Sequence, residues 1–365
     1  MPSSIWRVHL IHVLVTAIGG GGHGDQILKA LRLASPGCYR IFGADAKPGR
    51  AQAELVEDFV VLPSAHDPVY PGRLFEICRR WDIQVLFHGC EPELKLFAEH
   101  RAQIAAAGIF LPINTSPLIR LCMDKAALNK RLDDLGFGSS RYALVADPDD
   151  LAAIDWFPLV VKPSVGGGGS ANVYIAQTSQ ELMALAEYLT LGKTTHGFVI
   201  QEYVGRPEEE FTVGVLHDLH GRFVDSIAVQ RDLSGGLNRR MVVPNRTAKA
   251  ELGPRLVISS GISQGRIGKF HQITDQCREI ADALGSHGPL NIQCRFVDGK
   301  VRVFEINPRY SGTTSLRAMV GFNEPDLMIR HHLLQEQIPR DRDWPETDIE
   351  RTLIEHIVKQ GSHET

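Results

Sequence analysis

The sequence has little that would tie it to a membrane, a nucleic acid or an oxidising compartment. No apolar run reaches the length of about 18 residues that a membrane-spanning helix needs. The net charge is −4 at pH 7, and no basic stripe of the kind that binds a duplex is present. The nearest cluster, Arg239, Arg240 and Arg246, suits a small anion better. The six cysteines lack CxxC spacing, which excludes a zinc site and a disulfide framework. We therefore expect a cytoplasmic protein with free thiols and no nucleic-acid or membrane partner.

Glycine is the residue that the sequence has in excess. The chain has 34 glycines in 365 residues, whereas average usage of about 7% predicts roughly 26. Five of them lie in residues 19–24 and four in residues 166–169, so two short clusters account for the excess. A local excess excludes a collagen-like or low-complexity chain and directs attention to two glycine loops.

Residues 10–113 alternate short apolar runs with helical patterns. Apolar strands that alternate with helices predict a parallel sheet covered on both faces. The expected strands are His12–Thr16, Arg40–Ala44, Phe59–Leu62, Val85–His88 and Ile109–Pro112, and the expected helices lie near residues 24–33, 71–81, 91–107 and 116–135. From residue 147 the pattern changes to hairpins, at residues 159–164 with 171–176, then 198–204, 210–217, 222–230, and 290–297 with 301–307.

The first glycine loop fits the spacing GxGxxG at Gly19, Gly21 and Gly24, and Asp45 ends the next strand about 20 residues later. Glycines permit close approach of a ligand, and the N-terminus of the following helix attracts a phosphate. Four consecutive glycines satisfy many templates, however. A nucleotide site, a substrate-facing anion site and a tight turn therefore all stay open here.

The second glycine loop follows an apolar strand that ends in Lys162. Successive glycine amides can wrap phosphate oxygens while the lysine offsets their charge. The order differs from a Walker A loop, because the lysine precedes the glycines. The alternative is a flexible hairpin tip with a solvated lysine. Downstream, the strand end at residues 199–204 can supply an apolar slot for adenine, and the carboxylate of Glu210 suits ribose hydroxyls.

The hairpin of residues 291–309 carries the strongest signal. Asp298 and Gly299 mark its turn. A three-residue loop with a bulge at Gly299 would place Gln293 and Glu305 on one face, whereas a two-residue loop would pair Gln293 with Phe304. We predict the bulged loop. One face is then polar (Asn291, Gln293, Glu305, Asn307) and the other is apolar (Ile292, Cys294, Phe296, Phe304). Oxygen ligands with few carboxylates suit Mg²⁺.

Together these segments resemble the ATP-grasp superfamily, especially its carbamoyl-phosphate-synthase-like branch. The resemblance spans residues 10 to about 335 and follows five motifs in family order. These are Asp124-Lys125; Val161-Lys162-Pro163 with its glycine loop; Gln201-Glu202-Tyr203-Val204; Glu210-Phe211-Thr212-Val213; and Gln293 with Phe304-Glu305-Ile306-Asn307-Pro308-Arg309. The chain has a single ATP-grasp unit, so carbamoyl phosphate synthesis by the usual route is not expected.

The resemblance implies a mixed α/β and α+β fold. Residues 1–114 would form a Rossmann-like pre-ATP-grasp domain with a parallel sheet. A two-lobed ATP-grasp domain of antiparallel sheets with helices would follow, with its small lobe and linker helix at residues 115–195 and its large lobe at 196–335. Residues 336–365 would form a C-terminal extension.

The resemblance also implies roles for single residues. Lys125 and Lys162 would contact ATP phosphates, and the loop with Ser164, Gly167, Gly168, Gly169 and Ser170 would close over them. Adenine would meet Glu202, Tyr203 and Val204, and ribose would meet Glu210. One or two Mg²⁺ ions, with Mn²⁺ as an alternative, would be held by Gln293, Glu305 and Asn307. Arg309 would stabilise a phosphorylated intermediate, with Lys162 and Asn307 as further catalytic residues.

The leading hypothesis is an ADP-forming carbon–nitrogen ligase that joins a small, amino-acid-like carboxylate to an amine through an acyl phosphate. Candidate substrate residues are Gly20, Gly21, His23, Glu91, Arg231, Arg240, Arg266 and His271. A homodimer is possible. The alternatives are a non-catalytic ATP-binding regulator and an NAD(P)-dependent oxidoreductase that uses the first glycine loop.

Overall fold

The computed structural model describes residues 10–48, 51–138, 140–145, 148–165, 172–191 and 197–355. The chain forms two compact units. Unit 1 consists of Met1–Ser116, Arg309–Arg340 and Thr352–Thr365, and unit 2 consists of Pro117–Pro308 and Asp341–Arg351. The division at residues 114, 195 and 335 stays a prediction. None of the described helices is long and apolar enough to cross a membrane, and all six cysteines are free of disulfides.

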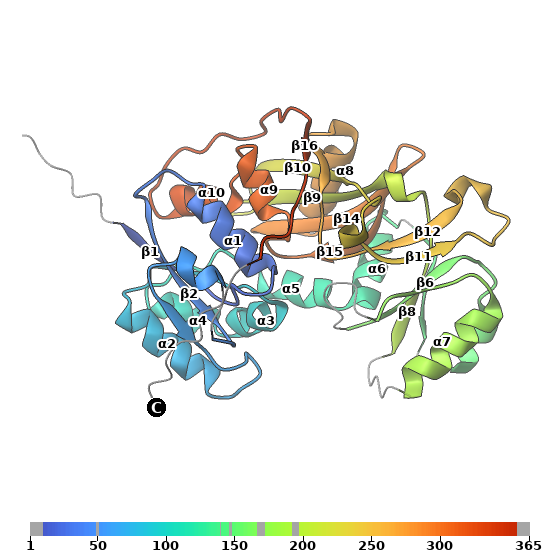
Figure 1. Ribbon diagram of the computed structural model, residues 1–365, viewed down its shortest axis with the longest axis horizontal. Coiled ribbons are helices and arrows are strands. Elements are labelled where there is room, and N and C mark those ends of the chain that lie inside the picture. The colour runs from blue at the N-terminus through green and yellow to red at the C-terminus, as the bar shows by residue number, and fades with distance from the viewer. Residues whose placement is uncertain are drawn as a thin grey trace, which may run out of the picture. The chain divides into compact units, whose positions relative to one another are not determined.

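Unit 1 is built on a parallel four-stranded sheet with the order β3-β2-β1-β4, and Figure 1 labels its strands β1 and β2. Its strands are β1 (Ile11–Val15), β2 (Tyr39–Asp45), β3 (Phe59–Val61) and β4 (Val85–Phe87). Val13, Leu14 and Val15 are fully buried, as the apolar pattern predicts for a sheet covered on both faces. The first four of the five expected strands are confirmed. The fifth, at 109–112, is reduced to one parallel β-bridge between Phe110 and Val85.

The helices of unit 1 come from two separate stretches of the chain. The first stretch supplies α1 (His23–Arg32), the 3₁₀ helix η1 (Ala51–Leu55), α2 (Tyr70–Arg80), α3 (Glu91–Glu99) and α4 (Arg101–Ala106). The second supplies α9 (Thr314–Met319) and α10 (Glu324–His332), which lie beside α1 (Figure 1). Tyr310 and Ile329 join the buried core of β1 and β4, and the Tyr39 hydroxyl donates to Asp326 Oδ1 at 2.6 Å.

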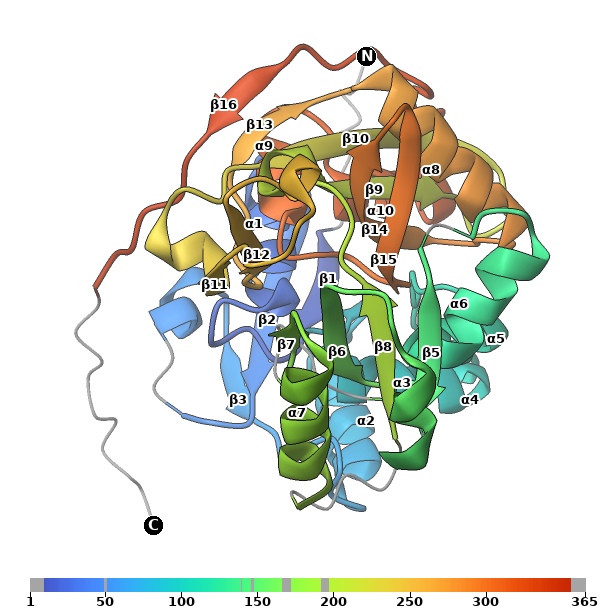
Figure 2. The same cartoon turned by 90° about the vertical axis from the view of Figure 1, so that its right-hand side faces the viewer.

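Unit 2 contains a small antiparallel sheet with the order β5-β8-β6-β7, beside which α7 packs (Figure 2). This sheet consists of β5 (Tyr142–Val145), β6 (Leu159–Pro163), β7 (Tyr174–Ala176) and β8 (Phe198–Glu202), with η2 (Pro148–Ala153) and α7 (Ser179–Leu191). The helix expected at 116–135 is divided into α5 (Ser116–Met123) and α6 (Lys125–Asp134). Asp124 separates them because its side chain caps α6, accepting from the amides of Ala126 and Ala127 at 3.0 and 3.1 Å.

The larger antiparallel sheet of unit 2 has six strands in the order β15-β14-β9-β10-β13-β16. They are β9 (Glu210–His217), β10 (Phe223–Arg231), β13 (Gly265–Gly268), β14 (Pro289–Val297), β15 (Lys300–Asn307) and β16 (Thr347–Ile349). The apolar faces of α8 (His271–Ala283), α5 and α6 share a core with this sheet. A separate hairpin pairs β11 (Arg239–Pro244) with β12 (Arg255–Ser259), and short 3₁₀ turns lie at η4 (Pro207–Glu209), η5 (Gly236–Asn238) and η6 (Ala250–Leu252).

The β14–β15 hairpin corrects one prediction. The turn has two residues, Asp298 and Gly299, with φ of 51° and 72°, and Val297 pairs with Lys300. The predicted three-residue loop is therefore wrong. The register shifts instead between Gln293 and Cys294, where Phe304 is an extra residue in β15. The predicted pairing of Gln293 with Glu305 is confirmed, but Phe304 leaves the apolar face and lines a cavity.

Candidate active site

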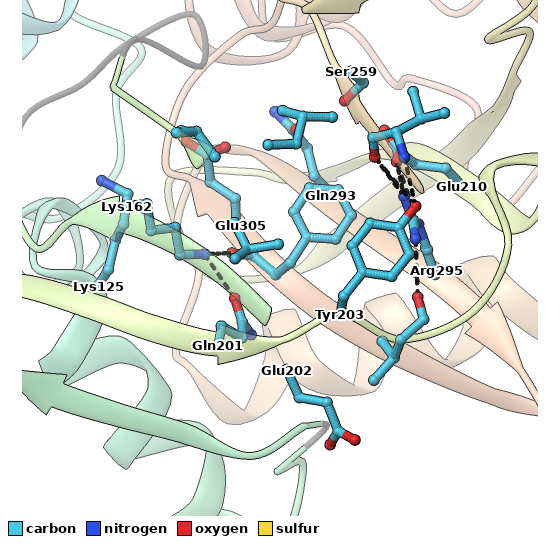
Figure 3. Close-up of a pocket in the computed structure, with 16 residues that line it drawn as sticks. Lys125, Lys162, Gln201, Glu202, Tyr203, Glu210, Ser259, Gln293, Arg295 and Glu305 are labelled. Carbon is cyan, nitrogen blue, oxygen red and sulfur yellow. Dashed lines mark hydrogen bonds and ion pairs between the residues drawn. The ribbon is translucent and has the colours of Figure 1, made fainter. Parts of the chain in front are cut away.

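A cavity in unit 2 gathers residues from both sheets, from β12 and from the start of α6 (Figure 3). Eight residues that the sequence singled out line it, although they lie in six separate stretches of the chain. They are Lys125, Lys162, Glu202, Tyr203, Val204, Glu210, Gln293 and Glu305. In Figure 3 the two lysines lie at one end and Glu210 with Arg295 at the other, and Glu305 and Gln293 lie between them.

Lys162 is held at the lysine end by two acceptors. Its Nζ donates to Gln201 Oε1 and to the carbonyl of Phe304, both at 2.7 Å. The side chain is buried, and this burial lowers the pKa of Lys162 to about 8, with a smaller upward effect from Glu305 and a further downward effect from Lys125. The ammonium is therefore costly to keep charged in this buried position, and an anion placed beside it would stabilise that charge.

The segment that follows Lys162 is tied to the start of α6. The amide of Lys125 donates to the carbonyl of Ser164 at 3.1 Å, and the backbones of Asp124 and Val165 form an isolated antiparallel β-bridge. This link brings Lys125 to the same cavity as Lys162. Ser164 is buried behind it. The predicted lid residues Gly167, Gly168, Gly169 and Ser170 lie outside the described residues.

Glu210 lies buried between two arginines at the opposite end. Arg295 Nη2 approaches its Oε2 at 3.2 Å, and Arg231 Nη1 approaches its Oε1 at 3.3 Å. Arg231 was a candidate substrate residue, yet it is 4% exposed and also donates to Ser259 and to the carbonyls of Ser260 and Ile262. It therefore lies behind the carboxylate and not on the cavity wall.

Gln293 and Glu305 face the cavity from adjacent strands. Asn307 is buried opposite Asn291 and is not part of the cavity lining. No three His, Cys, Asp or Glu side chains in the described ranges gather into a metal site. One carboxylate and one amide oxygen fit a Mg²⁺ ion whose other ligands are water and phosphate.

Three further substrate candidates lie away from this cavity. Arg240 is exposed on β11. Arg266 is half exposed and pairs with Asp348 at 3.2 Å and with Glu346 at 3.5 Å. His271 begins α8 and contacts Asp343 at 2.9 Å. Surface pairs of this kind contribute little to stability, and their carboxylate partners offset the positive charge that an anionic substrate would need.

Arg309 and Glu91 form an ion pair in unit 1, with Arg309 Nη2 2.9 Å from Glu91 Oε1. Two buried histidines, His23 and His88, lie beside each other with ring centroids 5.2 Å apart. Burial and, to a smaller extent, the charge of Arg309 lower the pKa of His88 to about 3, and the pKa of His23 is lowered for the same two reasons. Both imidazoles are therefore neutral at physiological pH.

The first glycine loop precedes this cluster. Gly20 and Gly21 adopt left-handed φ values of 79° and 73°, which favour glycine. Asp45, the acidic residue of the dinucleotide pattern, accepts hydrogen bonds from the amides of Gly19 and Lys47 at 2.7 and 3.1 Å. The carboxylate of Asp45 is thus engaged with the first glycine loop and with the turn that follows β2. This weighs against the ribose contact that the oxidoreductase hypothesis requires.

Sequence reasoning missed several residues of the cavity. Arg295 follows Gln293 by two positions on the same face of β14, so strand alternation was a usable signal for it. Val257, Ile258 and Ser259 come from β12, which reads in sequence only as a short apolar run. Their presence depends on how the β11–β12 hairpin packs, and no motif marks it.

Two family models match the chain. Residues 195–355 match the model described as ATP-grasp in the biosynthetic pathway with Ter operon, and residues 14–112 match the PylC-like N-terminal domain. Curated relatives include the carbamoyl phosphate synthase large chains of Methanothrix thermoacetophila and Thermoplasma acidophilum, each 26% identical. The matches cover 64% and 48% of this chain but only 21% and 16% of those proteins.

Solved structures share the fold at low sequence identity. An ADP complex of N5-carboxyaminoimidazole ribonucleotide synthetase aligns with a TM-score of 0.63 and 16% identity, covering 94% of this chain and 82% of that one. The biotin carboxylase domain dimer of Hydrogenobacter thermophilus 2-oxoglutarate carboxylase, with MgADP and bicarbonate, gives 0.62 and 14%, covering 91% and 71%. The L-amino acid ligase of Bacillus licheniformis gives 0.61 and 18%, covering 88% and 74%.

Proposed function

We propose that this chain, which carries an ATP-grasp domain, is a Mg²⁺- and ATP-dependent ligase that joins a small carboxylate to an amine. The observation that supports the proposal best is the single cavity lined by two lysines, the Gln293–Glu305 pair, the strand end at 202–204 and Glu210. Cationic, metal-binding, apolar and carboxylate groups occur there together, which is what the phosphates, metal, base and ribose of one nucleotide need.

In the proposed reaction a substrate carboxylate oxygen attacks the γ-phosphorus of ATP, and the bond from that phosphorus to the β,γ-bridging oxygen breaks. ADP leaves and an acyl phosphate forms. The amine then attacks the acyl carbon and loses a proton, and inorganic phosphate leaves as the amide forms. The protein mainly positions the reactants and offsets their charge.

The described residues have distinct tasks in this scheme. Lys125 and Lys162 would bind phosphate oxygens, and burial makes the charge of Lys162 depend on that anion. Glu305 and Gln293 would hold Mg²⁺, with Asn307 behind them, and the ion would offset phosphate charge. Arg309 would stabilise the acyl phosphate.

The substrate carboxylate is proposed to bind in unit 1, at the start of α1. This helix begins at His23 and its N-terminus has no side-chain cap. His23 Nε2 is buried with no hydrogen-bond partner in the described part of the chain. A neutral imidazole, the helix N-terminus and Arg309 form a setting that favours an anion. Amino-acid-like acids are the proposed class.

A screen for ADP release over pairs of carboxylates and amines, with product masses read directly, tests the proposal. Glu305→Ala should abolish ADP formation and leave the circular dichroism spectrum unchanged. Undiminished turnover in that variant would exclude the proposed metal site. If no pair stimulates ADP release although ATP binds, the regulator hypothesis replaces the ligase. A cytoplasmic location and a homodimer stay predictions.

A further inference from the structure

Arg295 makes an unusual set of contacts for a residue that lines a cavity. It is 5% exposed, and its guanidinium donates to three backbone carbonyls: Val204 at 3.0 Å, Gly205 at 3.1 Å and Val257 at 3.1 Å. It also reaches Glu210 Oε2 at 3.2 and 3.4 Å. All these donors come from one planar fork, whose rigidity a lysine could not reproduce.

The ring of Tyr203 completes this arrangement (Figure 3). The Arg295 guanidinium lies 4.3 Å from the ring centroid, a distance that suits a cation–π contact. The Tyr203 hydroxyl accepts from the amide of Val257 at 2.9 Å and lies 3.3 Å from its carbonyl. Tyr203 and Arg295 therefore both bond to Val257, and together they join β14, β9 and β12 to the segment 203–205.

The segment 203–205 is where the chain passes from β8 of the small sheet towards β9 of the large sheet. Because a peptide unit is planar, fixing the carbonyls of Val204 and Gly205 also fixes the direction of the amides that follow them. Gly205 has a φ of +69°, and a Cβ there would lie 2.5 Å from Val297 Cγ2. The backbone at this crossing is thus held from several sides.

The charges around Arg295 indicate that its role goes beyond pairing Glu210. Arg231 already approaches the other oxygen of Glu210 at 3.3 Å. If Arg295 were removed, Glu210 would keep one arginine and the buried pair would be neutral. Among the described side chains, Arg295 alone donates to the carbonyls of Val204 and Gly205, and it shares the carbonyl of Val257 with the Tyr203 hydroxyl.

We propose that Arg295 is a positioning residue that fixes the 203–205 crossing and thereby sets where a nucleotide base binds. The proposal rests on the proposed nucleotide site, because the strand end at 202–204 is its expected base-binding edge. Arg295 acts through the backbone that it holds and not on the reacting phosphate. Its loss should therefore weaken base binding and base discrimination more than turnover.

The test compares Arg295→Met and Arg295→Lys with wild type in two measurements. Calorimetry gives the Kd values of ADP and GDP, and hydrogen exchange without nucleotide reports the amides of residues 203–206. Arg278→Met is the matched control, because Arg278 also stacks on a ring, at 4.1 Å from the centroid of Phe223, but does not line the cavity.

Arg295→Met should weaken ADP binding about tenfold or more, reduce the ADP-to-GDP preference and speed exchange at 203–206, since a charge-assisted fork to three carbonyls is lost. Arg295→Lys should recover part of the affinity, and Arg278→Met should match wild type.

Unchanged exchange at 203–206 in Arg295→Met overturns the proposal whether or not nucleotide binds. Wild type that binds no nucleotide, with faster exchange in the variant, contradicts the proposed function and leaves Arg295 as the residue that fixes the crossing. If ADP binds wild type and Arg295→Met equally, the base-positioning role is excluded.

Discussion

Gln293 and Glu305 lie opposite each other across β14 and β15 because Phe304 is inserted between Val303 and Glu305. Between the insertion and the turn, from Cys294 paired with Val303 to Val297 paired with Lys300, the strands keep the regular register of a two-residue turn. Without an extra residue, Phe304 would take the position opposite Gln293 and Glu305 would point into the core. The insertion also leaves Phe304 without a partner residue on β14, and its carbonyl accepts from Lys162 at 2.7 Å. One added residue thus arranges both the Gln293–Glu305 pair and the carbonyl that accepts from Lys162.

Deletion of Phe304 separates these two effects. The deletion should keep Gln293 opposite Glu305, because Glu305 moves into the vacated position, but it removes the carbonyl that accepts from Lys162. Phe304→Ala keeps that carbonyl and loses only the ring. We expect calorimetry to show a loss of ATP affinity of about tenfold for the deletion, and a smaller loss for Phe304→Ala. Equal affinities in the two variants would contradict the role of the carbonyl.

The lowered pKa of Lys162, about 8, predicts how ATP binding depends on pH in the absence of metal. Below this pKa the ammonium of Lys162 is charged and attracts phosphate. Above it the nucleotide-free protein holds a neutral amine, which must take up a proton before it can attract the ATP phosphates. The Kd for ATP should therefore be level up to about pH 8 and then rise, by at most tenfold per pH unit. Lys162→Arg should remove the dependence, since arginine stays charged. A rise of the same steepness in this variant would assign the titration to another group.

Gln293→Glu should strengthen metal binding. The substitution keeps the size of the side chain and adds a second carboxylate opposite Glu305, and carboxylates are preferred ligands of Mg²⁺ and Mn²⁺. Titration of Mn²⁺ in the presence of ADP, followed by electron paramagnetic resonance, should give a Kd several-fold lower than wild type. The control is Asn291→Asp, at a position opposite Asn307 outside the cavity lining. If Gln293→Glu binds Mn²⁺ no better than wild type, Gln293 does not face the ion.

The ion pair of Lys269 with Asp225 predicts a large effect on stability. Both side chains are buried, at 2.9 Å from each other, and Asp341 approaches the same lysine at 3.0 Å. Lys269→Met leaves a buried carboxylate without its main cation, so we expect a loss of about 3 kcal/mol in the free energy of unfolding. Lys130→Met, which breaks the exposed pair with Asp134, should cost about 0.5 kcal/mol or less. Urea denaturation of both variants measures the difference, and similar losses would contradict this account.

Much of the fold follows from local patterns. Strands β3 and β4 are continuous apolar runs, and β1 and β2 are mainly apolar, interrupted by His12 and Arg40. Asp124 begins α6 by the capping that its residue type favours. The cavity residues were predictable where a motif has a fixed spacing along one strand, as for Lys162 and Glu305. Strand alternation could also have identified Arg295.

Other features depend on packing between distant segments. The position of the bulge at Phe304 is set by the core, because Val303 and Ile306 are both buried while Phe304 and Glu305 point to the cavity. The residues of β12 reach the cavity through a hairpin that no motif identifies. The burial of Arg231 behind Glu210 likewise depends on Ser259 and the carbonyls of the loop that follows β12.

The two-part composition of unit 1 affects how the protein can fold during synthesis. The core of β1 and β4 includes Tyr310 and Ile329, about 300 residues downstream of the first strand. A ribosome that has completed the parallel sheet has therefore not yet made the residues that fill it. Residues 117–308 of unit 2 are translated before Tyr310 and Ile329 are made. Unit 1 therefore cannot complete its core until most of unit 2 exists, and the chain departs from the usual N-to-C order in which domains mature.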